Sequence, residues 1–294
     1  MRGPHHDEFS QVLYARGWAC SLRGDFEEAV SWNAQGLDHA RRHLAPEGRE
    51  DDRLLLQGHL YLGGNYLDLD EPGKARAELE QALEYGRRRR LWHYLEVGRV
   101  HRQLGRLEVR EKNWDSAHGH LRAAIDFYTE HEDLVLLATA HNGMGDYYLA
   151  RFGPAHRQRA LDHYVRALAL AGASKPPNTY YECASLLNIC RARIRTREPE
   201  IDQGDRHVGT DASPVERRFE DLVEDVRQLG QEHKYRNHLA RLALVEAEYF
   251  LRKGDVTRAR DAADQAEHLG RNFSPLLLDE VRIALDRLNL SANR

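Results

Sequence analysis

The chain has 294 residues, of which 41% are hydrophobic and 31% are charged, and its formal net charge is -4. Because 43 basic residues are balanced by 47 acidic ones, no overall positive field would hold a polyanion, and bulk nucleic-acid binding is disfavoured. The N-terminal residues lack the apolar stretch of a signal peptide, and nowhere do about eighteen apolar residues run together as in a membrane span. We therefore expect a cytoplasmic protein that makes no use of a membrane.

A pattern of small and apolar residues begins near residue 10. In the first copy, Gly17 precedes a turn at Gly24 and Asp25, and Ala29 and Leu37 follow the turn. This order predicts two short amphipathic helices joined by a tight turn. The offsets recur in three later stretches, which contain Gly63, Tyr66, Ala75 and Ala82, then Gly105, Trp114, Ala117 and Ala124, and then Gly145, Tyr148, Ala160 and Ala167. Small residues at these places let paired helices approach each other closely.

These residues resemble the tetratricopeptide repeat family, whose helix pairs carry a small residue at the eighth position, an aromatic near the eleventh and alanines later. The four repeats start near Ser10, Leu56, Gly98 and Ala138, which gives spacings of 46, 42 and 40 residues. The usual spacing in the family is about 34 residues. The long variant is similar to the repeats of kinesin light chains, of bacterial peptide receptors and of the sensor regions of signal-transduction ATPases.

The second half of the chain is less regular. Residues 180–195 have helical periodicity, and the polar segment 196–213 predicts an insertion loop. Residues 214–231 place apolar side chains at steps of three and four, so they can complete a fifth pair. A sixth pair follows over 235–270, and a helix over 275–290 has the polar outer face that caps a repeat array.

We therefore predict an all-α fold, a right-handed α-solenoid of about six helix pairs plus a C-terminal capping helix. The whole chain, 1–294, is expected to form one superhelical array. Its repeats are expected near residues 7–45, 51–90, 91–131, 132–173, 177–232 with the loop at 196–213, and 235–270, with the cap at 275–290.

No motif for catalysis is present. The sequence contains no phosphate-binding glycine loop, nucleophile elbow, zinc-binding His pair on a helix or Cys-x-x-Cys pair. His39 and His43 share a helix face, but Arg41 and Arg42 lie between them and would oppose a cation. We therefore predict no catalytic residue, no cofactor and no metal, and we do not expect an enzyme.

Three histidines recur at one repeat position. His59, His101 and His141 each occupy the fourth position, where the resemblance implies a large apolar residue facing the paired helix. The favoured interpretation is a half-buried imidazole bonded to a neighbouring group. The alternative is a column that senses pH, since histidine titrates near neutrality.

The resemblance implies that the first helix of each pair lines a concave wall, with defined positions facing a ligand. In repeat three these positions carry Arg99, Arg102, Gln103, Arg106 and Arg110. Steps of three and four also place them on one helix face, where like charges repel mildly. An acidic ligand segment would relieve that repulsion. The other repeats contribute Asn142 and Asp146, then Asn188, Arg191 and Arg195, and an aromatic patch of Tyr14, Trp18 and Tyr61 suited to anchoring bulky side chains.

The sequence thus predicts a protein-protein interaction scaffold that binds a peptide or a partner protein in its concave groove, through an acidic and partly apolar segment. The alternative is a sensor or regulatory region of a larger bacterial signalling or defence protein. RNA binding is the least favoured function. The expected partner is a protein or peptide, with homodimers left open.

Overall fold

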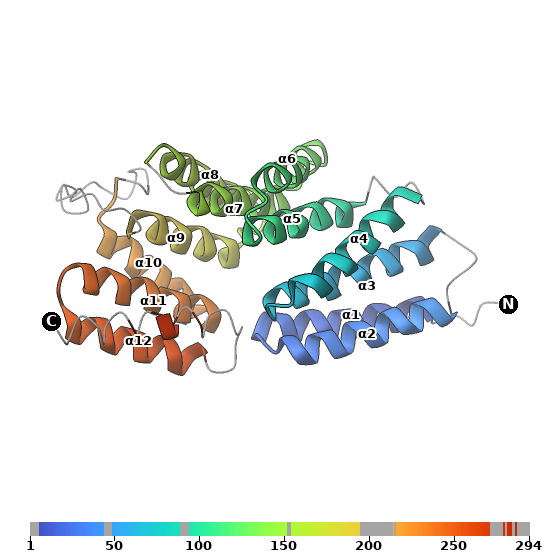
Figure 1. Ribbon diagram of the computed structural model, residues 1–294, viewed down its shortest axis with the longest axis horizontal. Coiled ribbons are helices and arrows are strands. Elements are labelled where there is room, and N and C mark those ends of the chain that lie inside the picture. The colour runs from blue at the N-terminus through green and yellow to red at the C-terminus, as the bar shows by residue number, and fades with distance from the viewer. Residues whose placement is uncertain are drawn as a thin grey trace. The chain divides into compact units, whose positions relative to one another are not determined.

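The computed structural model describes residues 6–43, 49–88, 94–151, 154–194, 214, 216–270, 279, 281–283 and 286, and helices are the only regular secondary structure in them. Twelve long helices lie within these residues (Figure 1). The prediction of an all-α fold is therefore confirmed. None of the described helices is long and apolar enough to cross a membrane.

The helices follow one another in consecutive packed pairs. Their bounds are α1 His6–Arg23, α2 Phe26–His43, α3 Arg49–Asp68, α4 Pro72–Arg88, α5 Leu95–Arg110, α6 Trp114–Glu130, α7 Leu134–Ala150, α8 Pro154–Ala173, α9 Thr179–Ile194, α10 Phe219–Glu232, α11 Arg236–Arg252 and α12 Val256–Gly270. In every pair the two helices contact each other, from α1 on α2 to α11 on α12. The predicted class of helical-repeat solenoid with six helix pairs is confirmed.

The described residues divide into two compact units. Unit 1 contains α1 to α6 and ends at His131, and unit 2 contains α7 to α12 and begins at Glu132. The single array over 1–294 and its repeat limits stay predictions, and the insertion loop 196–213 lies outside the described residues. So does most of the capping helix 275–290.

Close helix contacts explain the small residues in unit 1. A Cβ atom added at Gly63 would lie 2.6 Å from Cγ of Leu79, and one added at Gly105 would lie 2.6 Å from Cγ of Leu121. Each leucine is fully buried and comes from the second helix of the same pair. Any larger residue at the eighth position would therefore push the paired helices apart.

One turn geometry closes several pairs in both units. In unit 1 Asp70 and Lys112 adopt a positive φ of 60° and 62°, and in unit 2 Gly254 has a φ of 78°. The residue after each of them donates its amide to a carbonyl five residues earlier, as in the bond from Asn113 to Glu108 of 2.9 Å. This is the Schellman ending of a helix, which glycine forms with the least strain.

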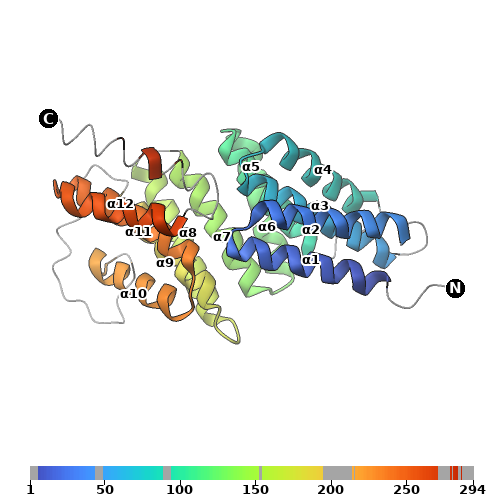
Figure 2. The same cartoon turned by 90° about the horizontal axis from the view of Figure 1, so that it is seen from below.

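In unit 2, helix α9 lies at the centre of the packing. It contacts α7, α8, α10 and α11, and Figure 2 shows α10 in light orange next to it. Ile189 and Ile194 of α9 are fully buried among Leu222 and Val226 of α10. Because α9 is enclosed, its polar residues must find partners on neighbouring helices rather than in water.

Candidate functional site

The first helices of successive pairs contact each other within each unit, α1 with α3 and α3 with α5 in unit 1, and α7 with α9 and α9 with α11 in unit 2. The predicted binding residues that the structure describes all lie on these first helices. Their local surroundings therefore decide what a ligand would meet.

The predicted aromatic patch borders a cavity of unit 1. The cavity has a volume of about 540 Å³ and is lined by residues of α1, residues of α3 and the residue that precedes α5. The lining residues are Gln11, Tyr14, Ala15, Trp18, Arg53, Leu54, Gln57, Tyr61 and Tyr94. The structure thus brings the three aromatic residues singled out in the sequence into one hollow, together with Arg53 and Tyr94, which the sequence pattern did not indicate.

The aromatic rings of this cavity have different roles. The ring centre of Tyr61 lies 5.7 Å from that of Tyr14 and 6.5 Å from that of Trp18. Tyr14 is buried, and its hydroxyl donates to the carbonyl oxygen of Leu54 at 2.9 Å. Burial raises the pKa of Tyr14. Trp18, by contrast, is 47% exposed, so Tyr14 forms a fixed wall and Trp18 presents a surface.

The predicted arginine stripe on α5 meets acidic residues at the end of α3. Arg106 donates to Oδ1 of Asp68 at 3.0 Å and to Oε1 of Gln103 at 2.8 Å. Arg110 pairs with Asp70 and donates to the carbonyl oxygen of Leu67. Arg99 and Arg102 are half-buried on the same helix. Two of the four arginines are therefore already neutralised inside unit 1.

Sequence reasoning missed this pairing because Asp68 and Asp70 lie at a helix end, where acidic residues commonly contact only solvent. Arg106 follows Asp68 by 38 residues, and Arg110 follows Asp70 by 40. These separations are close to the repeat length. Opposite charges about one repeat apart are therefore the signal that could have revealed the pairs.

In unit 2 the predicted site residues bond to one another. Asn142 of α7 donates to Oγ of Ser185 at 3.0 Å, and Asn188 of α9 donates to Oδ1 of Asn142 at 3.3 Å. These contacts join α7 to α9 across one repeat. A ligand approaching Asn142 would have to replace bonds that already exist.

A second polar group joins the same two helices. Asp146 of α7 accepts hydrogen bonds from the hydroxyl of Tyr164 at 2.8 Å and from Arg191 of α9. Desolvation raises the pKa of Tyr164 well above its ordinary value, so the phenol stays a donor. Arg195 lies outside the described residues. The predicted residues of repeats four and five that are described therefore come together as a structural network.

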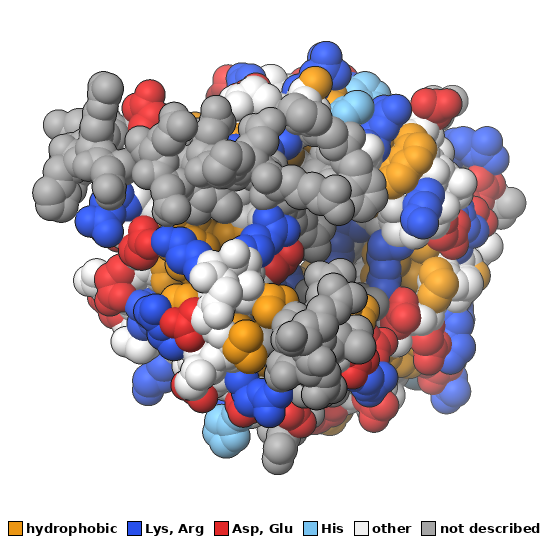
Figure 3. Space-filling model, turned by 60° about the vertical axis from the view of Figure 1, so that its left-hand side comes forward, with side chains coloured by type: hydrophobic (Ala, Val, Ile, Leu, Met, Phe, Trp, Pro, Cys, Tyr) orange, Lys and Arg blue, Asp and Glu red, His pale blue; other side chains and the backbone are white. Residues whose placement is uncertain are grey.

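Charges of both signs are interspersed on the molecule. Figure 3 shows basic and acidic side chains side by side on one face. Among the described residues, no three His, Cys, Asp or Glu side chains converge to hold a metal ion. The local polarity of the aromatic cavity, rather than a broad field, is what could select a ligand.

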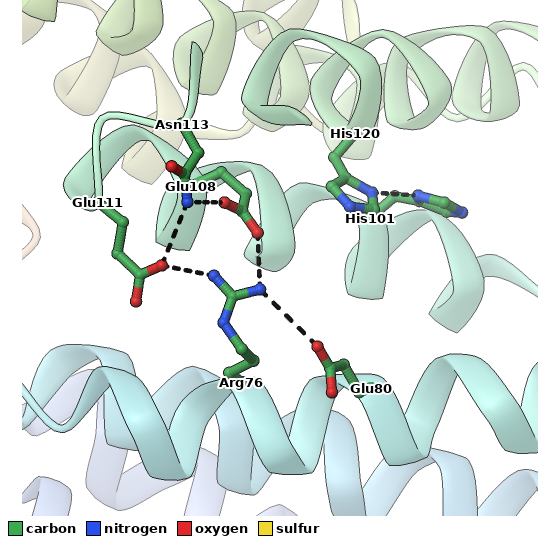
Figure 4. A network of polar contacts seen from close by, with 7 residues as sticks. All are labelled: Arg76, Glu80, His101, Glu108, Glu111, Asn113 and His120. Carbon is green, nitrogen blue, oxygen red and sulfur yellow. Dashed lines mark hydrogen bonds and ion pairs between the residues drawn. The ribbon is translucent and has the colours of Figure 1, made fainter. Parts of the chain in front are cut away.

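The three recurring histidines each face a partner on the second helix of their pair. Nδ1 of His59 lies 2.6 Å from Oε2 of Glu78. His101 and His120 approach through their Nδ1 atoms at 3.0 Å (Figure 4), and His141 and His163 do so at 2.8 Å. An imidazole bonded to its neighbour describes all three positions, but His59 and His141 are buried, at 2% and 4% exposed, rather than half-buried as expected.

Burial holds His101 and His141, one histidine of each pair, in the neutral form. Burial, followed by the charge of the partner histidine, lowers the pKa of His101 and of His141 to about 4. Only one proton fits between two facing Nδ1 atoms, so the neutral rings must adopt complementary tautomers. Protonating both rings would place two N–H donors against each other.

A buried ion pair lies close to the pair of His101 and His120 in unit 1 (Figure 4). Arg76 of α4 donates to Glu108 at 2.8 Å and to Glu111 at 2.6 Å, and Asn113 donates to Glu108 at 2.8 Å (Figure 4). Burial alone would raise the pKa of Glu108, but the hydrogen bonds from Arg76 and Asn113 outweigh it and lower the pKa. Glu108 is 4% exposed, so this contact fixes α5 against α4.

Comparison with known proteins identifies the fold. No protein-family model and no curated protein matches the chain. The crystal structure of the apo form of RapI is similar over 90% of this chain and 84% of its own, with 13% sequence identity and a TM-score of 0.62. BtubC (BKLC) from P. vanneervenii is similar over 78% of this chain and 82% of its own, with 16% identity and a TM-score of 0.55. The chain therefore has the fold of tetratricopeptide-like helical repeat proteins.

Proposed function

We propose that this protein is an interaction scaffold that binds a peptide or a segment of a partner protein on the first helices of unit 1. The observation that carries the proposal is the cavity in which Tyr14, Trp18 and Tyr61 meet. Aromatic side chains in a partly open hollow are the usual anchors of protein interfaces, because they bury a large area with few rotatable bonds.

The acidic and partly apolar character of the ligand is the second part of the proposal. The face of α5 carries four arginines, Arg99, Arg102, Arg106 and Arg110, of which Arg106 pairs with Asp68 and Arg110 pairs with Asp70. These arginines and most residues that line the aromatic cavity lie on the first helices of unit 1. A segment with both carboxylates and apolar side chains complements that combination.

The alternative, a sensor region of a larger signalling or defence protein, needs the same binding surface. The sensor function differs from the scaffold function in requiring further domains around the helical repeats and a response of the larger protein to binding. The function of the surface itself is therefore the first point to test.

The test is a selection of peptides from a random display library on the full chain, followed by affinity measurements on variants. Trp18→Ala should weaken the selected peptides on the order of tenfold or more, as expected for an aromatic anchor. Trp32→Ala is the matched control, because Trp32 lies on the second helix α2 and bonds to Glu28 of the same helix at 3.1 Å. Equal losses on both variants, or no selected peptide at all, would contradict the proposal.

A further inference from the structure

We propose that the cavity of unit 1 takes one aromatic side chain of the bound peptide, and that Arg53 at its wall binds the carboxylate of an acidic residue next to that aromatic residue. The inference rests on the proposed function and specifies the ligand of the same surface. Its grounds are the shape of the cavity, the fixed position of Arg53 and the charge of the lining.

The cavity has room for a large side chain. Its volume of about 540 Å³ lies within the range of about 300 to 1,000 Å³ that is common for ligand sites. Four aromatic rings line it, from Tyr14, Trp18, Tyr61 and Tyr94. An aromatic ring of the ligand can therefore contact these walls edge to face or offset, as aromatic rings prefer.

The apolar surface continues beyond the cavity on α1. Trp18 is 47% exposed and Leu22, four residues further along the helix, is 46% exposed. Residues at this spacing share one helix face. Covering these side chains with a ligand would remove apolar surface from water, which favours binding.

Arg53 is held in place from two directions. Its Nε and Nη2 atoms donate to Oε1 of Glu96 at 3.2 and 2.9 Å. Its guanidinium carbon lies 5.2 Å from the ring centre of Tyr94. The remaining terminal nitrogen, Nη1, has no partner among the described residues, and the side chain is 48% exposed. A donor that is already oriented loses little conformational freedom when it binds an anion.

The donor nitrogen that Arg53 keeps beside its ion pair with Glu96 favours a carboxylate over a cation. Arg53 is the only charged residue among the nine that line the cavity, and Gln11 and Gln57 are neutral. Glu96, the partner of Arg53, is 6% exposed and is not among the residues that line the cavity. Because Arg53 and the aromatic rings border one cavity, the carboxylate and the aromatic ring must come from neighbouring residues of the ligand.

The test uses four tetrapeptides that differ in one group each. Acetylated and amidated Ser-Phe-Asp-Ser carries the ring and a side-chain carboxylate, Ser-Phe-Asn-Ser lacks the carboxylate, and Ser-Ala-Asp-Ser lacks the ring. Acetylated Ser-Phe-Asn-Ser with a free C-terminus carries a carboxylate only at the chain end. Binding is followed by fluorine NMR on protein labelled with 5-fluorotryptophan, in which Trp18→Phe identifies the resonance of Trp18.

We expect Ser-Phe-Asp-Ser to shift the Trp18 resonance and to bind about fivefold or more tightly than amidated Ser-Phe-Asn-Ser, as a charge-assisted contact would give. Ser-Ala-Asp-Ser should leave the resonance unchanged. Equal affinities for the Asp and Asn peptides would overturn the role of Arg53. Tighter binding of the peptide with the free C-terminus would overturn the assignment to an acidic side chain.

Variants of Arg53 and Glu96 separate recognition of the peptide carboxylate from effects on folding. Arg53→Gln alone would leave Glu96 buried without its partner, so the double variant Arg53→Gln/Glu96→Gln is used with Glu96→Gln as its control. The double variant should lose the preference for Asp over Asn, and Glu96→Gln should keep it. If both variants keep it, the inference is wrong.

Failure of this inference can be told apart from failure of the proposed function. One outcome is that peptides from the display library bind the protein and lose affinity on Trp18→Ala while the aromatic tetrapeptides leave the Trp18 resonance unchanged. In that case the scaffold proposal stands, and the proposal of an aromatic and acidic ligand is overturned. If no library peptide binds, both fall together.

Discussion

Residues of the predicted ligand-facing set on the first helices have different surroundings in the two units. In unit 1, Trp18 and Tyr61 border an open cavity. In unit 2, Asn142 and Asn188 bond to each other and so join α7 to α9. A ligand would gain new contacts at Trp18 in unit 1, whereas at Asn142 in unit 2 it would first have to break existing ones. A position predicted to face a ligand can therefore border a cavity in one repeat and join two helices in another.

The largest effect should come from the buried ion pair of unit 1. Arg76→Ala leaves Glu108, which is 4% exposed, without its charge partner, so we expect the free energy of unfolding to fall by about 3 kcal/mol. Urea denaturation followed by circular dichroism measures it. Arg122→Ala, which removes an exposed pair with Asp126 on α6, should change it by less than about 0.5 kcal/mol. Similar losses in both variants would show that Glu108 is not enclosed as described.

The second largest effect is the dependence of the free energy of unfolding on pH, to which the histidine pairs of both units contribute. The native pKa of His101 and of His141 is about 4, below the value of about 6.5 for an unfolded histidine. The unfolded state therefore binds more protons between these values, so stability is present above about pH 6.5 and is lost as the pH falls toward 4. Each such histidine should lower the free energy of unfolding by about 2 kcal/mol between pH 7 and pH 5.

Replacing one histidine pair at a time shows which unit causes the dependence of stability on pH. The variants His101→Gln/His120→Gln and His141→Gln/His163→Gln should each flatten the dependence of the free energy of unfolding on pH. His118→Gln, an exposed residue of α6, is the control and should leave it unchanged. A pair whose replacement does not flatten the curve is not buried in neutral form.

The third effect contrasts stability with binding. Asn142→Ala removes the partner of Ser185 and Asn188, and we expect a loss of about 1 to 2 kcal/mol in unfolding free energy. Trp18→Ala should change stability by less than about 0.5 kcal/mol because Trp18 is 47% exposed, yet it should weaken peptide binding. If Trp18→Ala destabilises more than Asn142→Ala, the contrast between the two units is wrong.

The smallest effect on stability should come from substitutions at helix ends with a positive φ. Lys112 in unit 1 and Gly254 in unit 2 both end a helix with positive φ, 62° and 78°. Lys112→Gly should raise the midpoint of thermal unfolding, by a stabilisation of about 0.5 to 1 kcal/mol, and Gly254→Ala should lower it by a similar amount. A loss on Lys112→Gly would mean that its side chain contributes more than the strain costs.

The sequence predicted the components of the aromatic cavity only in part. The ligand-facing positions that the resemblance to the repeat family implies indicate Tyr14, Trp18 and Tyr61, and the four-residue step from Tyr14 to Trp18 also places those two on one helix face. The sequence pattern did not indicate Arg53 and Tyr94, because Arg53 lies near the start of α3 and Tyr94 directly precedes α5. Their place at the cavity depends on how α5 approaches α3 through the bond from Arg53 to Glu96.

The sequence by itself determined the all-α class, the six helix pairs and the small residues between them. The reason is that helix periodicity, tight turns and close contacts such as Gly63 on Leu79 are encoded within about forty residues and repeat along the chain. Only the tertiary structure decided which polar residues pair. The contacts of Arg110 with Asp70 and of Asn188 with Asn142 span 40 and 46 residues. They form because packing sets one repeat against the next, and a spacing of about one repeat indicates candidate partners without selecting among them.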